Sequence, residues 1–173
     1  MKYLVKFFVV TLFFIFSTHS FAEQKIVVLD MKFVLNNSKA GKEAQEFLKK
    51  EFNNNAQKFT ELEKSLKEEE NDLLRTRAEL TKEKYKKKTD ELRSKVIKYQ
   101  SERRASLDKL ATQRSNARKI LMEKIEPIVD SYISENEISL VIDKKNMIGG
   151  LTVDVIAILI VDKLNKQLPS INL

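Results

Sequence analysis

Apolar and polar residues alternate along most of this chain with the period of a helix rather than that of a strand. Between Gly41 and Pro127 the sequence contains no glycine and no proline, and it is rich in residues that favour helix. Large apolar residues recur at seven-residue intervals in the first half of this segment, at Phe52, Phe59, Leu66, Leu73 and Leu80. A seven-residue apolar repeat predicts a long helix that packs against a partner helix as a coiled coil.

The apolar seam is narrow, and it lapses once around a cluster of lysines. Asn55, Glu69 and Thr76 occupy sites at which a second row of apolar residues would otherwise lie. After Leu80 the repeat stops, and apolar residues resume at Leu92 in three- and four-residue steps. The pattern predicts two helical segments with a thin apolar face each, separated by the lysine-rich stretch.

Charge favours a chain reversal between the two helical segments. If the chain turns near residue 85, the acidic segment 61–72 faces the basic segment 98–109, and weak ion pairs can form across the interface. We therefore expect a long antiparallel helical hairpin, a coiled-coil arm, over residues 42–126, with its tip near 82–91. A single continuous rod is the alternative, because the turn region contains no glycine, proline or asparagine.

Short β-branched segments lie at both ends of the predicted hairpin. Residues 25–30 (KIVVLD) and 138–143 (ISLVID) each predict a strand. Asp30 then stands where it can cap a short helix, MKFVLNNS, which Gly41 separates from the arm.

A last helix is expected near the C-terminus. Residues 154–168 fit a helix that Pro169 ends. The apolar stretch 151–161 also fits a strand, and its periodicity does not separate the two.

These elements predict an α+β fold, mostly α, in which the hairpin is inserted between N- and C-terminal strands. Residues 23–41 and 127–173 would form a small β-rich body. A body below about 70 residues without a disulfide or metal is marginally stable, so we expect oligomerisation through it. The candidate oligomer contacts are the apolar strand residues Ile26, Val28, Leu140 and Ile142.

The first 22 residues have the pattern of a secretory signal peptide. Lys2 and Lys6 precede the apolar run 7–16, and the following STHSFA has small residues at Ser20 and Ala22. The run is shorter than the roughly 20 apolar residues of a transmembrane helix. We expect export across the inner membrane and cleavage after Ala22, with an uncleaved anchor as the alternative.

The mature chain lacks the residues that most catalytic sites need. Its only histidine, His19, lies in the signal peptide, and the whole chain has no cysteine and no tryptophan. Disulfides, zinc sites built on His or Cys, and Ser-His or Cys-His nucleophiles are therefore excluded. The Gly41-Lys42 pair lacks the earlier glycine of a phosphate-binding loop, since Asn36 stands there. We expect no enzyme activity and no cofactor.

Charge bears on the kind of partner. The chain carries 32 basic and 25 acidic residues, and the excess of basic residues lies in the predicted arm. Nucleic acid is disfavoured by the export signal and by the acids interspersed along the arms, although a basic nucleic-acid binder is kept as a second alternative. Long charged arms with a sparse apolar seam instead suit loose holding of an unfolded, acidic or amphipathic chain. The candidate binding residues at the arm tip are Lys82, Lys84, Tyr85, Lys86, Lys87 and Lys88.

Three stretches resemble one known family. VVLDMKFVLNNSKAGKEAQEFLKKEF, residues 27–52, resembles the N-terminal signature of the Skp/OmpH family of periplasmic outer-membrane-protein chaperones. ISLVIDKKN, residues 138–146, is similar to the family's second strand, and DKLNKQ, residues 162–167, to its C-terminal helix. The arms match in length and composition, and the apolar VDVIAILIV departs from the family's more polar sequence before the last helix.

The resemblance implies a homotrimer shaped like a jellyfish, with a β-barrel-like body and three hairpin arms around a cavity. It implies a periplasmic chaperone that holds unfolded outer-membrane β-barrel proteins without ATP and carries them toward outer-membrane assembly. Transient contact of the basic tips with anionic lipid headgroups is a further expectation, and nucleic acid is not. The alternative function is a structural coiled-coil spacer or assembly factor of the cell envelope.

Overall fold

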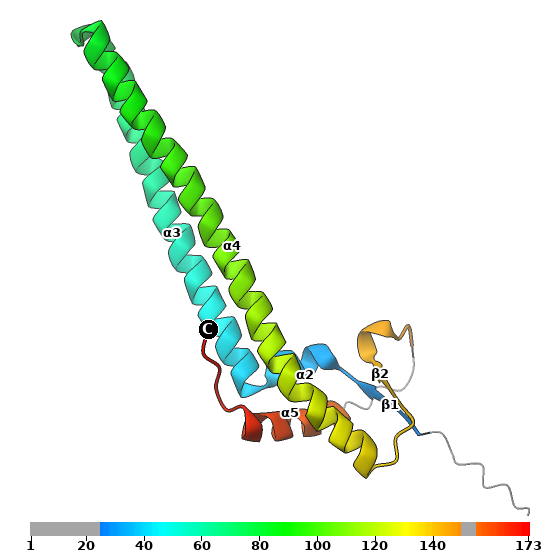
Figure 1. The fold of residues 1–173 in the computed structure, drawn as a ribbon. Helices are drawn as coiled ribbons and strands as arrows, with labels where there is room; N and C mark the ends of the chain where they lie inside the picture. Colours follow the sequence, from blue (N-terminus) through cyan, green and yellow to red (C-terminus); the bar gives the residue numbers. More distant parts are fainter. Residues whose placement is uncertain (1–24, 150–154) are drawn as a thin grey trace, which may run out of the picture.

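The computed structural model describes residues 25–149 and 155–173, and the predicted signal peptide lies outside them (Figure 1). The described part is mostly helical with one small sheet, which confirms the α+β, mostly α, fold class. The elements in chain order are β1 (Ile26–Leu29), α2 (Met31–Asn37), α3 (Lys39–Arg75), the 3-10 turn η1 (Arg77–Glu79), α4 (Lys82–Glu135), β2 (Leu140–Asp143), the 3-10 turn η2 (Lys144–Asn146) and α5 (Val155–Gln167).

The two long helices, α3 and α4, lie side by side and run in opposite directions (Figure 1). The Lys95 ammonium lies 2.8 Å from the Glu69 carboxylate, and the Lys58 ammonium lies 3.9 Å from that of Glu102. The chain therefore folds back on itself, and acidic side chains of α3 meet basic side chains of α4.

The reversal lies earlier in the chain than residue 85, where we expected it. α3 ends at Arg75, and α4 already begins at Lys82, so the turn occupies Thr76 to Thr81. The hydroxyl of Thr81 accepts a hydrogen bond from the backbone N–H of Lys84 at 3.3 Å and caps α4. Threonine is a good N-cap, so this turn needs no glycine, proline or asparagine. The lysine cluster predicted for the tip consequently forms the first turns of α4.

The junction between α2 and α3 is set by two caps. Asp30 accepts from the backbone N–H of Phe33 at 2.8 Å, which confirms its predicted capping of α2. The helix break lies at Ser38, however, and not at Gly41 as we expected. Ser38 is fully buried, and its hydroxyl accepts from the backbone N–H of Gly41 at 3.2 Å. Gly41 lies in the first turn of α3, where a Cβ would collide with the carbonyl oxygen of Leu35.

Pro127 does not end α4. We expected the arm to stop before it, but α4 continues as a single helix to Glu135. Proline removes one helical hydrogen bond and crowds the preceding turn, at a cost of about 3 kcal/mol in an exposed helix. Here the apolar side chains on either side of it, Ile125 and Ile128, are buried in the core, and their burial offsets that cost.

The sheet pairs the two ends of the chain. β1 and β2 are parallel, with Ile26 opposite Leu140 and Val28 opposite Ile142. These two strands form the whole sheet within the described residues.

The core lies where the sheet, α2, α5 and the base of the hairpin meet. Its most buried large side chains are Val34, Ile125, Ile160 and Leu164. The sequence does not distinguish helix from strand for residues 151–161. The structure is helical there from Val155 onward, and residues 150–154 lie outside the described part.

The C-terminal residues lie against the base of α3 (Figure 1). The side-chain oxygen of Asn165 accepts from the backbone N–H of Lys39 at 2.7 Å, and the Glu43 carboxylate accepts from the backbone N–H of Ile171 at 2.9 Å. Ile171 itself is buried. Within residues 25–149 and 155–173, no helix has both the length and the apolar character that crossing a membrane requires.

Candidate functional site

The predicted tip residues all lie in the first turns of α4, at the far end of the hairpin from the body (Figure 1). The side chains of Lys82, Lys84, Lys86, Lys87 and Lys88 are exposed. None of these five lysines forms an ion pair within the described part of the chain. They form a basic surface whose attraction for anions is weak per residue and sensitive to salt.

Tyr85 differs from its lysine neighbours because it is half-buried. The guanidinium of Arg77, in the turn, lies 5.5 Å from the centre of the Tyr85 ring. This cation–π contact covers one face of the ring. Tyr85 therefore holds the turn against α4, and it is less open for stacking with a partner than its sequence position indicated.

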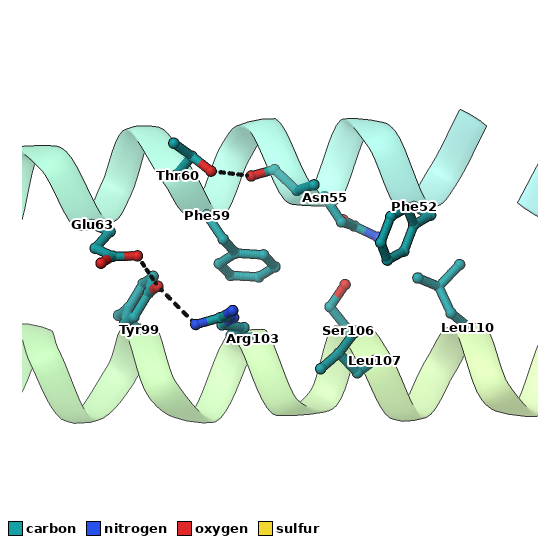
Figure 2. Close-up of a pocket in the computed structure, with 11 residues that line it drawn as sticks. Phe52, Asn55, Phe59, Thr60, Glu63, Tyr99, Arg103, Ser106, Leu107 and Leu110 are labelled. Atoms are coloured by element: carbon teal, nitrogen blue, oxygen red, sulfur yellow. Dashed lines mark hydrogen bonds between the residues drawn. The ribbon is translucent and has the colours of Figure 1, made fainter. Parts of the chain in front are cut away.

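The middle of the hairpin contains a groove between α3 and α4 (Figure 2). Phe59 and Tyr99 meet edge to face across the seam, with ring centres 5.9 Å apart. The Tyr99 hydroxyl donates to the Glu63 carboxylate at 3.3 Å and accepts from the Arg103 guanidinium at 3.4 Å. Toward the body, Phe52, Ser106, Leu107 and Leu110 continue the lining, and the groove measures about 180 Å³.

Large apolar side chains are exposed along the hairpin. Phe52, Ile97 and Leu107 are respectively 55%, 60% and 53% exposed, and Leu62 and Leu74 are exposed as well. The polar residues Asn55 and Ser106 occupy seam positions at the groove. The narrow seam predicted from the sequence therefore leaves apolar surface open between the helices and beside them. The groove itself was missed, because its depth depends on how the two helices align.

The four predicted oligomer residues lie together on one face of the sheet. Ile26 is 53% exposed and Leu140 is 51% exposed, and these two residues pair across the strands. Val28 and Ile142, two residues further along each strand, are half-buried on the same face. Leu29 is buried, and with Val27 and Val141 it packs into the core. The structure thus brings together a small apolar surface on a sheet whose two edges pair with no further strand among residues 25–149 and 155–173.

The carboxyl ends of the two strands are joined by an ion pair. The Lys144 ammonium lies 3.2 Å from the Asp30 carboxylate. The backbone N–H of Phe33 and the Lys144 ammonium together hold the pKa of the Asp30 carboxyl below its usual value. Asp143 accepts from the backbone N–H of Lys145. Both carboxylates are thus occupied with structural contacts.

Metal-binding clusters are not found in the part of the chain that the structure describes. No group of three or more His, Cys, Asp or Glu side chains is arranged there to hold a metal ion. The features that remain as candidates for function are surfaces: the basic tip, the groove with its exposed apolar neighbours, and the apolar face of the sheet.

Comparison with known proteins gives one family and one fold. The family model described as "Outer membrane protein (OmpH-like)" matches residues 25–160. A crystal structure from Caulobacter crescentus CB15, of a protein proposed to be an OmpH-like outer membrane chaperone, superposes with a TM-score of 0.76 at 13% sequence identity. The alignment covers 91% of this chain and 93% of that chain, so the two share a fold over nearly their whole length. No curated protein sequence matches this chain.

Proposed function

Because the chain belongs to the OmpH-like outer membrane protein family, we propose that it is a periplasmic chaperone that holds unfolded outer-membrane β-barrel proteins. Holding needs no ATP and no catalytic step, since it rests on many weak and reversible contacts. The chain would keep its clients from aggregating until they reach the outer membrane.

The observation that carries this proposal is the apolar surface of the hairpin. Apart from the side chains that belong to the core at its base, the described arm buries Phe59 and Leu73 alone among its apolar residues, whereas five large apolar side chains are exposed. A long helical pair that served only as a rod would gain stability by burying these groups. Apolar groups spread singly over a charged surface instead favour weak contacts with many different sequences.

We propose that the functional form is a homotrimer joined through the body. The supporting observation is the two-stranded sheet, whose outer edges meet no third strand in the described part of the chain and whose outer face exposes Ile26 and Leu140. Unpaired edges of this kind pair readily with further strands. Strands from three copies would extend the sheet toward a closed barrel, and three arms would then project from one end and enclose a cavity.

The basic tips would act as an outer, salt-sensitive contact. Lys82, Lys84, Lys86, Lys87 and Lys88 would attract acidic clients, and transiently the anionic headgroups of lipids. We further propose that export uses residues 1–22 as a signal peptide that is cleaved after Ala22.

The test is suppression of aggregation by the purified chain of residues 23–173. An unfolded outer-membrane β-barrel protein is diluted from urea into buffer, and light scattering is followed with and without the chain. A chaperone of this kind abolishes scattering at near-stoichiometric amounts and without ATP. If scattering is unchanged at a large excess of the chain, the proposal is wrong and a structural spacer takes its place.

A further inference from the structure

The two sides of the α3–α4 hairpin are built differently. One side, here called the bridged flank, carries both ion pairs that join the helices, Lys58–Glu102 and Glu69–Lys95. A hollow near the tip also lies on this flank, and charged side chains make up most of its lining. The other side, here called the grooved flank, carries two hollows with a more apolar lining. The first is the groove around Phe59, and the second is lined by Leu66, Arg93, Val96 and Ile97. Glu63 and Tyr99 line both hollows, so the two are continuous.

Arginine and lysine segregate between these two flanks along α4. Lys88, Lys95, Glu102 and Lys109 follow one another at seven-residue intervals, and this row contains the α4 partners of both ion pairs. A second row with the same interval consists of Arg93, Gln100, Leu107 and Arg114. Arg93 and Gln100 line the second hollow and Leu107 lines the first, which places this row on the grooved flank. Arg104 follows Ile97 by seven residues and lies beside it on the same side.

The arginines of the grooved flank form few interactions with the rest of the described chain. Among the described residues, Arg93, Arg104 and Arg114 form no ion pair and no side-chain hydrogen bond, and Arg103 contacts the Tyr99 hydroxyl alone. A guanidinium is weakly hydrated, stacks on aromatic rings and binds carboxylates through two parallel hydrogen bonds. Protein-binding surfaces are enriched in arginine and aromatic residues and depleted in lysine. The α4 side of the grooved flank has this composition, and the lysine row of the bridged flank does not. On the α3 side, Glu63, Lys67 and Glu70 also line the hollows, so the arginines of α4 supply the excess of positive charge there.

We propose that the grooved flank binds an extended segment of unfolded polypeptide that carries both apolar and acidic side chains. The inference rests on the proposed chaperone function and deepens it, because it names the binding face and the chemistry of the client segment. Aromatic or branched side chains enter the hollows beside Phe52, Ile97 and Leu107. Carboxylates of the same segment pair with Arg93, Arg104 and Arg114.

The dimensions of the flank fit an extended chain. A cavity of about 150 Å³ holds a benzene molecule in another protein, so the groove of about 180 Å³ can take one aromatic ring. Arg93 and Arg114 are 21 positions apart, a rise of roughly 31 Å along the helix, which an extended chain covers in about ten residues. Because neighbouring side chains of an extended chain point to opposite sides, alternating apolar and acidic residues suit a surface with hollows in the middle and arginines at the rim.

A pair of labelled peptides tests the charge preference. One is a twelve-residue peptide that alternates Phe or Val with Glu or Asp, and its twin has Lys at every acidic position. Fluorescence anisotropy with the chain of residues 23–173 at low salt is expected to give at least about tenfold tighter binding of the acidic peptide. Equal affinity for the two peptides would overturn the proposal.

Matched variants locate the binding face. Replacing Arg93, Arg104 and Arg114 with Gln is expected to weaken binding of the acidic peptide about tenfold. The control replaces Lys98, Lys109 and Lys124 with Gln, which removes the same charge elsewhere on α4 and is expected to change the affinity by less than about twofold. Equal losses in both variants would reduce the effect to net charge and overturn the assignment.

Photo-crosslinking needs only single substitutions, so it tests the binding face even if a triple variant folds poorly. A photoreactive residue replaces Leu107 on the grooved flank in one variant, and Lys109 on the bridged flank in another. Adducts with the acidic peptide are expected from position 107 and not from position 109. Equal adducts from both positions, or an adduct from 107 to a second copy of this chain, would overturn the proposal. If these tests overturn the binding face but the unchanged chain still suppresses aggregation of a β-barrel protein, the chaperone function stands without this face.

Discussion

Gly41 is a position at which the addition of a single methyl group is expected to destabilise the fold. The chain closes so tightly between α2 and α3 that a Cβ at this position would meet the Leu35 carbonyl and the Ser38 hydroxyl. We predict that Gly41→Ala destabilises the protein by about 3 kcal/mol, because the backbone of α2 or α3 must shift to make room. The measurement is urea unfolding followed by circular dichroism at fixed protein concentration.

Gly149 provides the matched control for this substitution. Nothing lies within 4 Å of a Cβ built there, so Gly149→Ala is expected to leave the urea midpoint nearly unchanged. If the two variants unfold at the same midpoint, the close contact at Gly41 is not the constraint described above.

Asp30 makes a second residue-scale prediction, and this one depends on pH. Its carboxylate caps α2 and pairs with Lys144, and its pKa is lowered from the usual 3.8. A carboxyl with a lowered folded-state pKa stabilises the fold above its unfolded-state pKa, and the contribution is lost as the pH falls through the folded-state pKa. Asp30→Ala removes the cap and the charge and should cost about 1 kcal/mol at pH 7.

Asp30→Asn separates the two roles of this side chain. Asparagine caps helices as well as aspartate does, so this variant should keep most of the stability at pH 7 and lose the additional acid sensitivity that Asp30 contributes. Urea unfolding of the three proteins at pH 7 and at pH 3 makes the comparison. An acid sensitivity of Asp30→Asn equal to that of the unchanged chain would contradict the part assigned to the charge.

At the scale of elements, the helical segments and the strands could be predicted from residue types, but several boundaries could not. The seven-residue repeat from Phe52 to Leu80 and the absence of glycine and proline were sufficient to identify long helices. The position of the turn cannot be predicted from the lysine cluster, because Thr81 caps the next helix and the lysines after it are good helix formers. Local rules predict a helix boundary at Pro127, and they do not include the burial of Ile125 and Ile128, which supports the helix on either side of it.

The basic start of α4 carries an element-scale prediction. Replacing Lys84, Lys86, Lys87 and Lys88 with Gln should weaken capture of an unfolded β-barrel client at low ionic strength, by about fivefold, and have little effect at high salt. The helix itself should remain, because Thr81 still caps it and glutamine favours helix. Client binding is measured by fluorescence anisotropy at two salt concentrations.

The matched control removes four exposed lysines near the base of the hairpin. Replacing Lys42, Lys49, Lys50 and Lys124 with Gln changes the net charge by the same amount. Client affinity at low salt that falls equally in both variants, or in neither, would remove the tip from the mechanism.

At the scale of the whole molecule, the fold depends on contacts that no local pattern contains. The parallel pairing of β1 with β2 joins residues more than a hundred positions apart, and so do the contacts of Asn165 and Ile171 with the first turns of α3. The two strands could be predicted from their continuous β-branched and apolar runs. The use of Ile26, Val28, Leu140 and Ile142 as an oligomer interface stays a prediction. The grooved flank was missed, although the seven-residue spacing of Arg93, Leu107 and Arg114 is a signal that could have shown it.

The face of the sheet makes a prediction about assembly. Ile26→Lys places a charge on the exposed apolar face next to Leu140, so the variant should form smaller species than the unchanged chain, as seen by size-exclusion chromatography. Leu74→Lys, which adds the same charge at an exposed position on the arm, serves as the control. Assembly that is equally disturbed by both variants, or by neither, would argue against an interface through this face.

The most direct test of the account is the solution mass of residues 23–173, alone and with an unfolded outer-membrane β-barrel protein, by light scattering coupled to size exclusion. The account predicts three copies of the chain alone, and a single soluble species of three copies with one client after mixing. A monomer that leaves the client in aggregates would contradict both the assembly and the holding function.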